Sequence, residues 1–174
     1  MESKYRRGIT SARTHLQVTS LALQRYANAQ EKELYAKMLY YGAFFVFVRS
    51  ALQALEKSDA KHDELLMEIQ KRIFVEKIKP SEIYKSLIGE RHLVGHGEDS
   101  WAANPFMPLS MIDRFLAAGS DWDAAFDDVW PDDPFKGQPI LDVLNTIWRQ
   151  VSNWLDEVDS EHEKAWARRQ SLAG

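Results

Sequence analysis

The chain has 174 residues, 45% of them hydrophobic, which suits a single domain over residues 1–174 with a substantial core and excludes bulk disorder. It has no cysteine, which excludes disulfides and thiolate metal sites, and its formal net charge of −4 argues against a general nucleic-acid coat protein. The most apolar run, YYGAFFVFVRSALQAL, is interrupted by Arg49, and the basic N-terminus lacks the apolar stretch of a secretory signal. We therefore expect a cytoplasmic protein that does not enter the membrane.

Three helical patterns fill the first half of the chain. Residues 9–28 are consistent with a first helix, with apolar positions at Leu16, Leu21, Leu23 and Tyr26. Residues 31–57 give a stronger pattern, with apolar positions at Leu34, Met38, Tyr41, Phe45, Val48, Leu52 and Leu55. Because Phe44–Val48 is apolar all round, the middle of this helix is predicted to be deeply buried. A third helix is predicted over 60–78, with Leu65, Leu66, Ile69, Ile73 and Ile78 facing inward.

A fourth helix is expected to begin at Pro80 and Ser81, because proline is tolerated in a first helical turn and serine is a good cap. Its pattern continues through Leu87 into the segment that holds Arg91, and Gly95 and Gly97 bracket its expected end.

The chain changes character from Ser100 to Pro139, which holds five of the six prolines and, between 121 and 133, six aspartates. A short helix is predicted over 109–118, and the rest of 101–138 reads as an irregular connection. A helix over about 139–167 follows, with a stripe of Ile140, Leu141, Leu144, Ile147, Trp148, Val151, Trp154, Leu155 and Val158. The stripe indicates core, and its two tryptophans are also compatible with a subunit interface.

Together these elements predict an all-α fold. We expect an antiparallel bundle of about five to six helices with an irregular Pro-, Trp- and Asp-rich excursion before the C-terminal helix.

Charge is distributed unevenly along the chain. The run from Lys71 to Arg91 carries six basic residues against three glutamates, whereas 121–133 carries only acidic charge. A locally basic patch can hold backbone phosphates, although solvated helix faces also explain such runs.

The segment GERHLVGHGEDSW, residues 89–101, gathers most of the candidate chemistry. His92 and His96 lie four positions apart and can share a helix face, which would suit a zinc ion with Glu98 or Asp99 nearby. Leu93 stands where a zinc hydrolase places its glutamate, so a metal site is not favoured, and no cofactor is expected. Nucleophilic catalysis is not favoured either, because cysteine is absent and no serine sits in a Gly-x-Ser-x-Gly turn.

Arg91 and His96 fit a different chemistry, the handling of a phosphodiester. Arginine presents a fixed charged fork to phosphate oxygens, and histidine gives or takes a proton near neutral pH. RNA cleavage by attack of the 2′-hydroxyl needs a base, an acid and a cation at phosphorus, and it needs no metal.

The helical geometry favours a dimer for this chemistry. On a continuous helix Arg91 and His96 are separated by about 140° and about 7.5 Å, so the arginine must reach round to join the histidine. His92 and His96 are only about 40° apart and line one groove. A two-fold dimer would bring two copies of His96 together, one as base and one as acid.

The residues RHLVGH resemble the Arg-x4-His signature of the HEPN superfamily (higher eukaryote and prokaryote nucleotide-binding domains), in which the residue after the arginine is usually polar, here His92. FFVFVRSALQALEK resembles the long second helix of that fold and IYKSLIGERHLVGHG its motif helix, so the resemblance covers roughly residues 31–100. It implies a homodimeric, metal-independent endoribonuclease of toxin or phage-defence type, with a cognate antitoxin as a potential partner. Carried over by position, Arg91 and His96 are catalytic and His92 is supporting.

One position departs from a class of HEPN toxins that is paired with nucleotidyltransferase antitoxins. Those toxins carry a tyrosine two places after the histidine, and this chain has Glu98, so modification of that tyrosine cannot operate here. Glu98 and Asp99 would also put negative charge beside a phosphate.

Other interpretations stay open at this point. A catalytically silent HEPN-like module would bind nucleotide, RNA or a partner protein, with the acidic, tryptophan-bearing segment 119–135 as its contact surface. A plain helical scaffold or an immunity-type protein is the third interpretation. In it, Arg91 pairs with an acid such as Glu90, His92 lies on the surface, and His96 interacts with the end of its helix.

Overall fold

The structure, a computed structural model, describes residues 8–30, 34–88, 135 and 137–173, and every regular element in that part of the chain is helical. It contains the α-helices α1 (Thr10–Asn28), α2 (Leu34–Ala54), α3 (Glu64–Ile73), α4 (Glu82–Ile88) and α8 (Ile140–Ala173). The predicted all-α fold class is confirmed. The predicted helix over 109–118 and most of the connection 101–138 lie outside the described residues.

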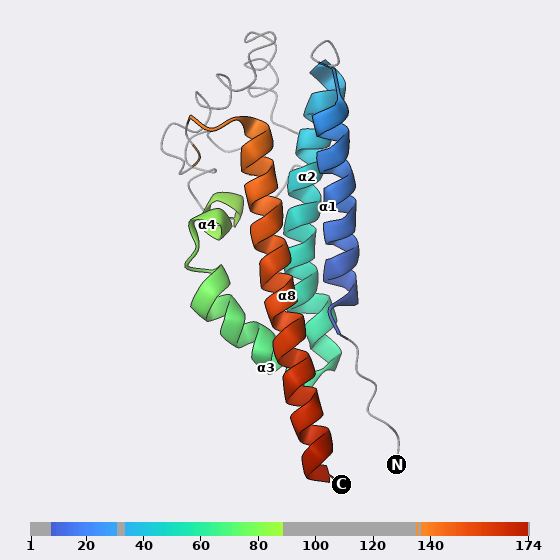
Figure 1. The fold of residues 1–174 in the computed structure, drawn as a ribbon, viewed down its shortest axis with the longest axis vertical. Coiled ribbons are helices and arrows are strands. Elements are labelled where there is room, and N and C mark those ends of the chain that lie inside the picture. The colour runs from blue at the N-terminus through green and yellow to red at the C-terminus, as the bar shows by residue number, and fades with distance from the viewer. Residues whose placement is uncertain (1–7, 31–33, 89–134, 136, 174) are drawn as a thin grey trace.

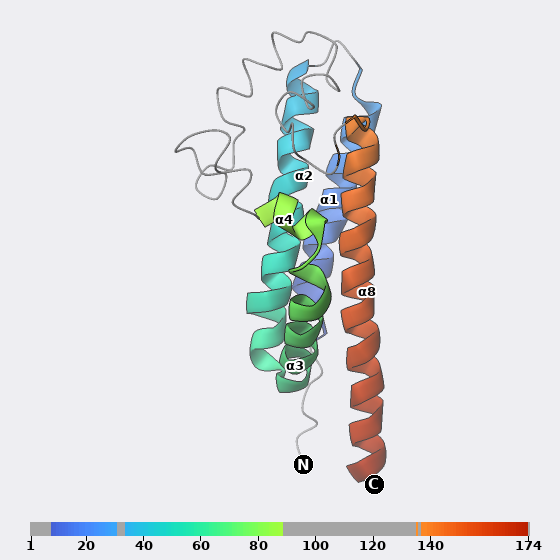
Figure 2. The ribbon, with the colours of Figure 1, turned by 90° about the vertical axis from the view of Figure 1, so that its left-hand side faces the viewer.

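Three long helices form the main layer of the bundle (Figure 1). Helix α1 packs against α2 over most of its length and also touches α8, while α3 packs on the other side of α8. Helices α1 and α3 run in one direction and α2 and α8 in the other, as the two views show (Figures 1 and 2). The core lies between these helices and contains most of the apolar residues that the periodicity predicted.

Helix α1 occupies nearly the predicted range, but its N-terminus is capped by a residue that is distant in the sequence. Ile9 precedes the helix and offers no side-chain cap. Instead the carboxylate of Asp59, only 6% exposed, accepts the backbone N–H groups of Ser11 at 3.0 Å and of Ala12 at 2.8 Å. Two of the free N–H groups of the first turn are thereby satisfied.

Three of the four apolar positions that indicated this helix are buried, Leu16, Leu23 and Tyr26, whereas Leu21 is 53% exposed. Leu21 lies about 140° round the helix from Leu16, and the buried Thr19 takes the inward position between them.

Helix α2 is central to the bundle, yet one of its faces is open. Phe44, Phe45 and Val48 are buried, whereas Val46 and Phe47 are only half-buried, so the prediction of a deeply buried middle is correct on one side alone. Towards its N-terminus the open face bears exposed apolar side chains, those of Tyr35 and Leu39. The other predicted inward residues whose side chains are described are all buried: Tyr41, Leu52 and Leu55.

The residues Tyr35–His62, which include all of α2 but its first residue, are long and apolar enough to cross a membrane, and about half of their most apolar window is buried inside the bundle. The core helix of a water-soluble bundle passes the same test, so this observation alone is weak evidence for a membrane span.

After α2 the chain leaves regular α-helical geometry and turns back. A π-helical turn, Leu55–Asp59, and a 3-10 turn, Ala60–His62, lead to α3, whose N-cap Asp63 accepts the backbone N–H of Leu66 at 3.0 Å. A second π-helical turn, Phe74–Ile78, ends this stretch. The five residues predicted to face inward here are all buried: Leu65, Leu66, Ile69, Ile73 and Ile78.

Helix α8 begins where predicted and runs six residues further than the predicted end at 167. Gly137, at φ +75°, and Pro139 set up its first turn, and the residues 168–173 contain no glycine or proline that would stop a helix. The predicted stripe is buried except at two positions. Leu141 is 36% exposed because Val143, on the opposite side of the first turn, takes the core position, and Trp148 is half-buried.

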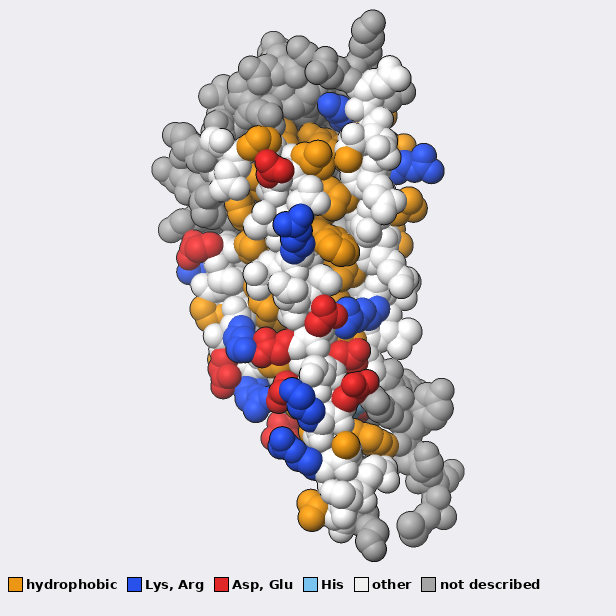
Figure 3. Space-filling view, in the orientation of Figure 1, with side chains coloured by type: hydrophobic (Ala, Val, Ile, Leu, Met, Phe, Trp, Pro, Cys, Tyr) orange, Lys and Arg blue, Asp and Glu red, His pale blue; other side chains and the backbone are white. Residues whose placement is uncertain are grey.

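Ion pairs connect α8 to its neighbours along the lower half of the face in Figure 3, where charged side chains gather. Arg13 of α1 lies 2.6 Å from Asp156, Arg72 of α3 lies 3.3 Å from Glu161, and Lys77 pairs with Glu157. Pairs as exposed as these contribute about 0–1 kcal/mol each, so the apolar core carries most of the stability of the fold.

Candidate functional site

The residues that the sequence singled out, Arg91, His92 and His96, lie outside the described residues. The nearest described element is α4, which ends at Ile88, three positions before Arg91. The geometry of the motif therefore stays a prediction, while the helix that leads to it can be described in detail.

Ser81 fixes the start of α4, as the sequence predicted. Its Oγ donates to the carbonyl oxygen of Ile78 at 2.7 Å and accepts the backbone N–H of Tyr84 at 3.0 Å. The hydroxyl thereby joins the end of the second π-helical turn to the first turn of α4 and sets the direction in which the helix leaves.

Packing holds α4 against the rest of the bundle. The ring of Tyr84 meets that of Phe74 edge-on, with centroids 5.2 Å apart and planes at 85°. Burial, and secondarily the negative charge of Glu56, raises the pKa of Tyr84 above its ordinary value. Leu87 is buried in the core, and α4 also contacts α2. Helix α4, which ends three positions before Arg91, is therefore held firmly against the bundle.

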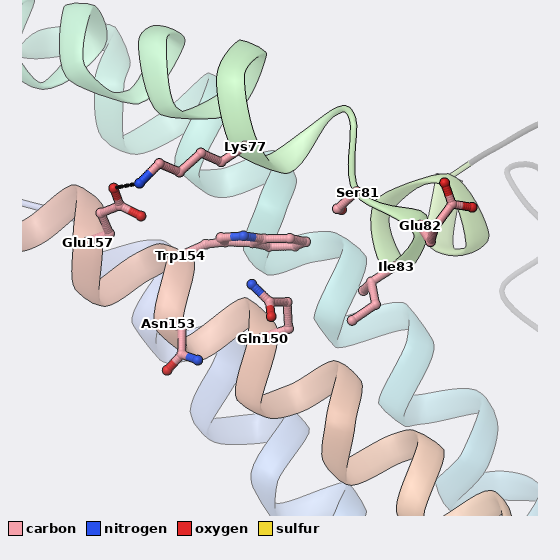
Figure 4. Close-up of a pocket in the computed structure, with 8 residues that line it drawn as sticks. All are labelled: Lys77, Ser81, Glu82, Ile83, Gln150, Asn153, Trp154 and Glu157. Atoms are coloured by element: carbon pink, nitrogen blue, oxygen red, sulfur yellow. Dashed lines mark hydrogen bonds and ion pairs between the residues drawn. The ribbon is translucent and has the colours of Figure 1, made fainter. Parts of the chain in front are cut away.

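A hollow of about 450 Å³ lies between the α3–α4 junction and α8, and we call it the junction hollow (Figure 4). It is lined by Lys77, Ser81, Glu82, Ile83, Gln150, Asn153, Trp154 and Glu157. Its size is within the range of about 300–1,000 Å³ that is common for small-molecule sites.

The polar groups of the junction hollow fall into two kinds. Its charged groups are paired, Lys77 with Glu157 and Glu82 with Lys85. The carboxamides of Gln150 and Asn153 have no hydrogen-bond partner within the described part of the chain. In Figure 4 the indole of Trp154, only 3% exposed, lies between the Lys77–Glu157 pair and the Gln150 amide. The tryptophan is thus part of its own chain's core, and it leaves an edge to the hollow.

A second hollow, of about 260 Å³, lies further along the α3–α8 groove. It is lined by Leu65, Glu68, Ile69, Arg72, Glu161, Lys164, Ala165 and Arg168. Glu161 bridges Arg72 and Lys164, and the hydrogen bond from Lys164 is the main reason why the pKa of Glu161 lies below its ordinary value. These cations are therefore partly neutralised by Glu161.

A buried histidine–aspartate pair was not predicted from the sequence. His162 of α8 is fully buried, with its Nε2 2.9 Å from Oδ2 of Asp63, a contact that does not meet hydrogen-bond geometry, so neither ring nitrogen has a hydrogen-bond partner among the described residues. The signal was present, because His162 follows Val158 by four positions and so continues the apolar stripe of α8. Because no solvent reaches His162 and Asp63 caps α3, we interpret the pair as structural.

Metal binding finds no support in the part of the chain that the structure describes, where no three His, Asp or Glu side chains gather. The pair His92 and His96 lies outside that part and is not tested by this observation.

We compared the chain with models of protein families, with curated protein sequences and with solved structures, and none of the three comparisons returned a match.

Proposed function

We propose that this protein is a metal-independent endoribonuclease of the HEPN type, of use to the cell as a toxin or in phage defence. The observation that carries the proposal is the sequence RHLVGH, in which Arg91 and His96 have the Arg-x4-His spacing and a polar residue, His92, follows the arginine. Two further features support it: the fold is all-α in its described part, and the motif directly follows an anchored helix, α4.

In the proposed reaction a His96 imidazole removes the proton of a ribose 2′-hydroxyl. The oxygen attacks the neighbouring phosphorus, and the guanidinium of Arg91 stabilises the charge that builds up on the phosphoryl oxygens. The bond from phosphorus to the 5′-oxygen then breaks, and an imidazolium, supplied by His96 of a second copy in a homodimer, protonates that oxygen. The products are a 2′,3′-cyclic phosphate and a 5′-hydroxyl, and His92 supports the arrangement.

The decisive experiment is RNA cleavage by the purified full chain in the presence of EDTA. We expect cleavage to persist under chelation, and His96→Ala and Arg91→Ala each to lower its rate at least about 100-fold, since one acid–base group commonly contributes that much. The matched control is His62→Ala, because His62 is an exposed histidine in the 3-10 turn before α3 and should not affect the rate.

Two results would contradict the proposal. If EDTA abolishes cleavage, a metal does the chemistry. If the wild-type chain leaves RNA intact and is harmless when overexpressed, the chain is not a ribonuclease of this kind.

The second candidate is a catalytically silent HEPN-like module that binds nucleotide, RNA or a partner protein. Glu98 and Asp99 favour it, because carboxylates beside Arg91 and His96 would compete with a phosphate for the positive charge. In that case RNA stays intact, and deletion of the acidic segment 119–135, its proposed contact surface, removes binding to the partner.

A further inference from the structure

The junction hollow combines unused hydrogen-bonding groups with an apolar wall. Gln150 and Asn153 both line it from α8; in Figure 4 the carboxamide of Gln150 points towards the indole of Trp154, whereas that of Asn153, an exposed residue, points away from it. Each carboxamide presents a donor and an acceptor side by side, and neither has a partner in the described part of the chain. Ile83 and the edge of Trp154 supply the apolar surface (Figure 4).

The charged residues of the hollow argue against an anionic ligand. Among the described lining residues the one cation, Lys77, is paired with Glu157, and Glu82 is paired with Lys85. A free phosphate would meet two carboxylates and no unpaired cation there, so the hollow is poorly suited to an anion. Its unpaired groups are neutral.

A nucleobase has the matching chemistry. Its edge carries donors and acceptors side by side, which asparagine and glutamine recognise with two hydrogen bonds, and its faces are apolar enough to lie against isoleucine and indole. A peptide group fits less well, because its N–H and C=O point in opposite directions.

The location of the hollow relates it to the predicted reaction centre. Residues Ser81, Glu82 and Ile83 form both a wall of the hollow and the start of α4. The seven residues of α4 span about 10 Å, after which the chain leads to Arg91 within three residues.

We infer that the junction hollow is a nucleobase subsite, in which the carboxamide of Gln150 reads the edge of one base of the RNA. The inference rests on the proposed function for the identity of the ligand, although binding of a base there can be measured without any cleavage.

The test uses the full chain and side-chain NMR signals of the carboxamides and of the indole N–H groups. The probes are the four nucleoside 5′-monophosphates, ribose 5-phosphate, and short oligoribonucleotides added to the His96→Ala variant. We expect at least one monophosphate, or an oligoribonucleotide that contains its base, to shift the signals of Gln150 and Trp154, and ribose 5-phosphate to leave them unchanged. Shifts with the oligoribonucleotide alone identify a base within RNA as the ligand, and shifts with the monophosphate show that a free nucleotide suffices.

The matched variants are Gln150→Ala and Gln170→Ala, the second of which removes an exposed glutamine near the other end of α8. Gln150→Ala should weaken binding about tenfold or more, as expected for loss of a two-bond contact to a base, and the control should not.

The outcomes separate this inference from the proposed function. If RNA is cleaved but no probe shifts these signals, or if Gln150→Ala binds like wild type, the subsite is refuted and the nuclease stands. If a base binds in the hollow and RNA stays intact, the nuclease proposal fails and the subsite stands.

Discussion

Asp59 caps a helix that is distant from it in the sequence. Its two carboxylate oxygens accept two backbone N–H groups at the start of α1, although nearly fifty residues separate it from Ser11 and Ala12. Charge-assisted hydrogen bonds of this kind are stronger than neutral ones, and negative charge at a helix N-terminus is favourable. Asp59 therefore links the end of the α2 segment to the beginning of α1.

The replacement Asp59→Ala should lower the free energy of unfolding by about 2–4 kcal/mol, because it removes a cap and leaves two shielded N–H groups without a partner. Urea unfolding followed by circular dichroism measures the change. The matched control is Ser58→Ala, an exposed neighbour in the same turn that should change the free energy of unfolding by less than about 0.5 kcal/mol. Equal effects of the two substitutions would show that Asp59 does not cap α1 in solution.

At the scale of the elements, α2 is unusual because it is apolar on nearly every side. Its inner face packs against α1, whereas Tyr35 is 75% and Leu39 is 64% exposed. Gly42 continues the same open face, and a Cβ added there would meet nothing within 4 Å. Exposed apolar surface on one helix face commonly marks a contact region.

If this face is open to water in the free protein, Leu39→Lys should change the free energy of unfolding by less than about 0.5 kcal/mol, because little apolar burial is lost. The comparison variant is Leu52→Ala on the inner face, where loss of a core leucine should cost about 2–5 kcal/mol. Chemical denaturation of both variants gives the two values. A loss for Leu39→Lys close to that of Leu52→Ala would mean that this face is covered in solution.

At the scale of the whole molecule, ion pairs join α3 to α8 on its solvent-exposed surface. The hydrogen bond and charge of Lys164, together with Arg72, depress the pKa of Glu161 in the folded chain. Because the unfolded chain binds that proton more readily, the contribution of Glu161 to stability is present above its ordinary pKa of 4.5 and is lost as the pH falls through the lower folded value.

Glu161→Gln should therefore make the loss of stability between pH 5 and pH 3 less steep than in wild type. The urea midpoint, measured at several pH values in this range, tests the expectation. Glu68→Gln is the control, since Glu68 lines the same hollow and no ion pair joins it to another described residue. Identical pH slopes for the two variants would show that the Glu161 cluster does not form in solution.

The helices could be predicted because periodicity in the sequence shows which face of a helix is buried. Errors occur at apolar positions on the border of that face. Leu141 is apolar but lies beside the buried stripe, so hydrophobicity alone placed it wrongly. The contacts of Asp59 and His162 depend on which elements meet in three dimensions, and no local pattern specifies them. The site at Arg91 was proposed from its motif and stays a prediction.

The pairing of Asp63 with His162 has a consequence for the order in which the protein can fold during translation. The ribosome delivers α3 long before α8, so the carboxylate at the start of α3 remains without its imidazole until the segment around His162 has been synthesised. Until then the side of α3 that packs on α8 has no partner and is exposed to water, although α3 can already contact the turns Leu55–Asp59 and Ala60–His62 that precede it. Closure of this bundle is therefore a late event, and the half-made chain exposes apolar surface that the finished chain covers.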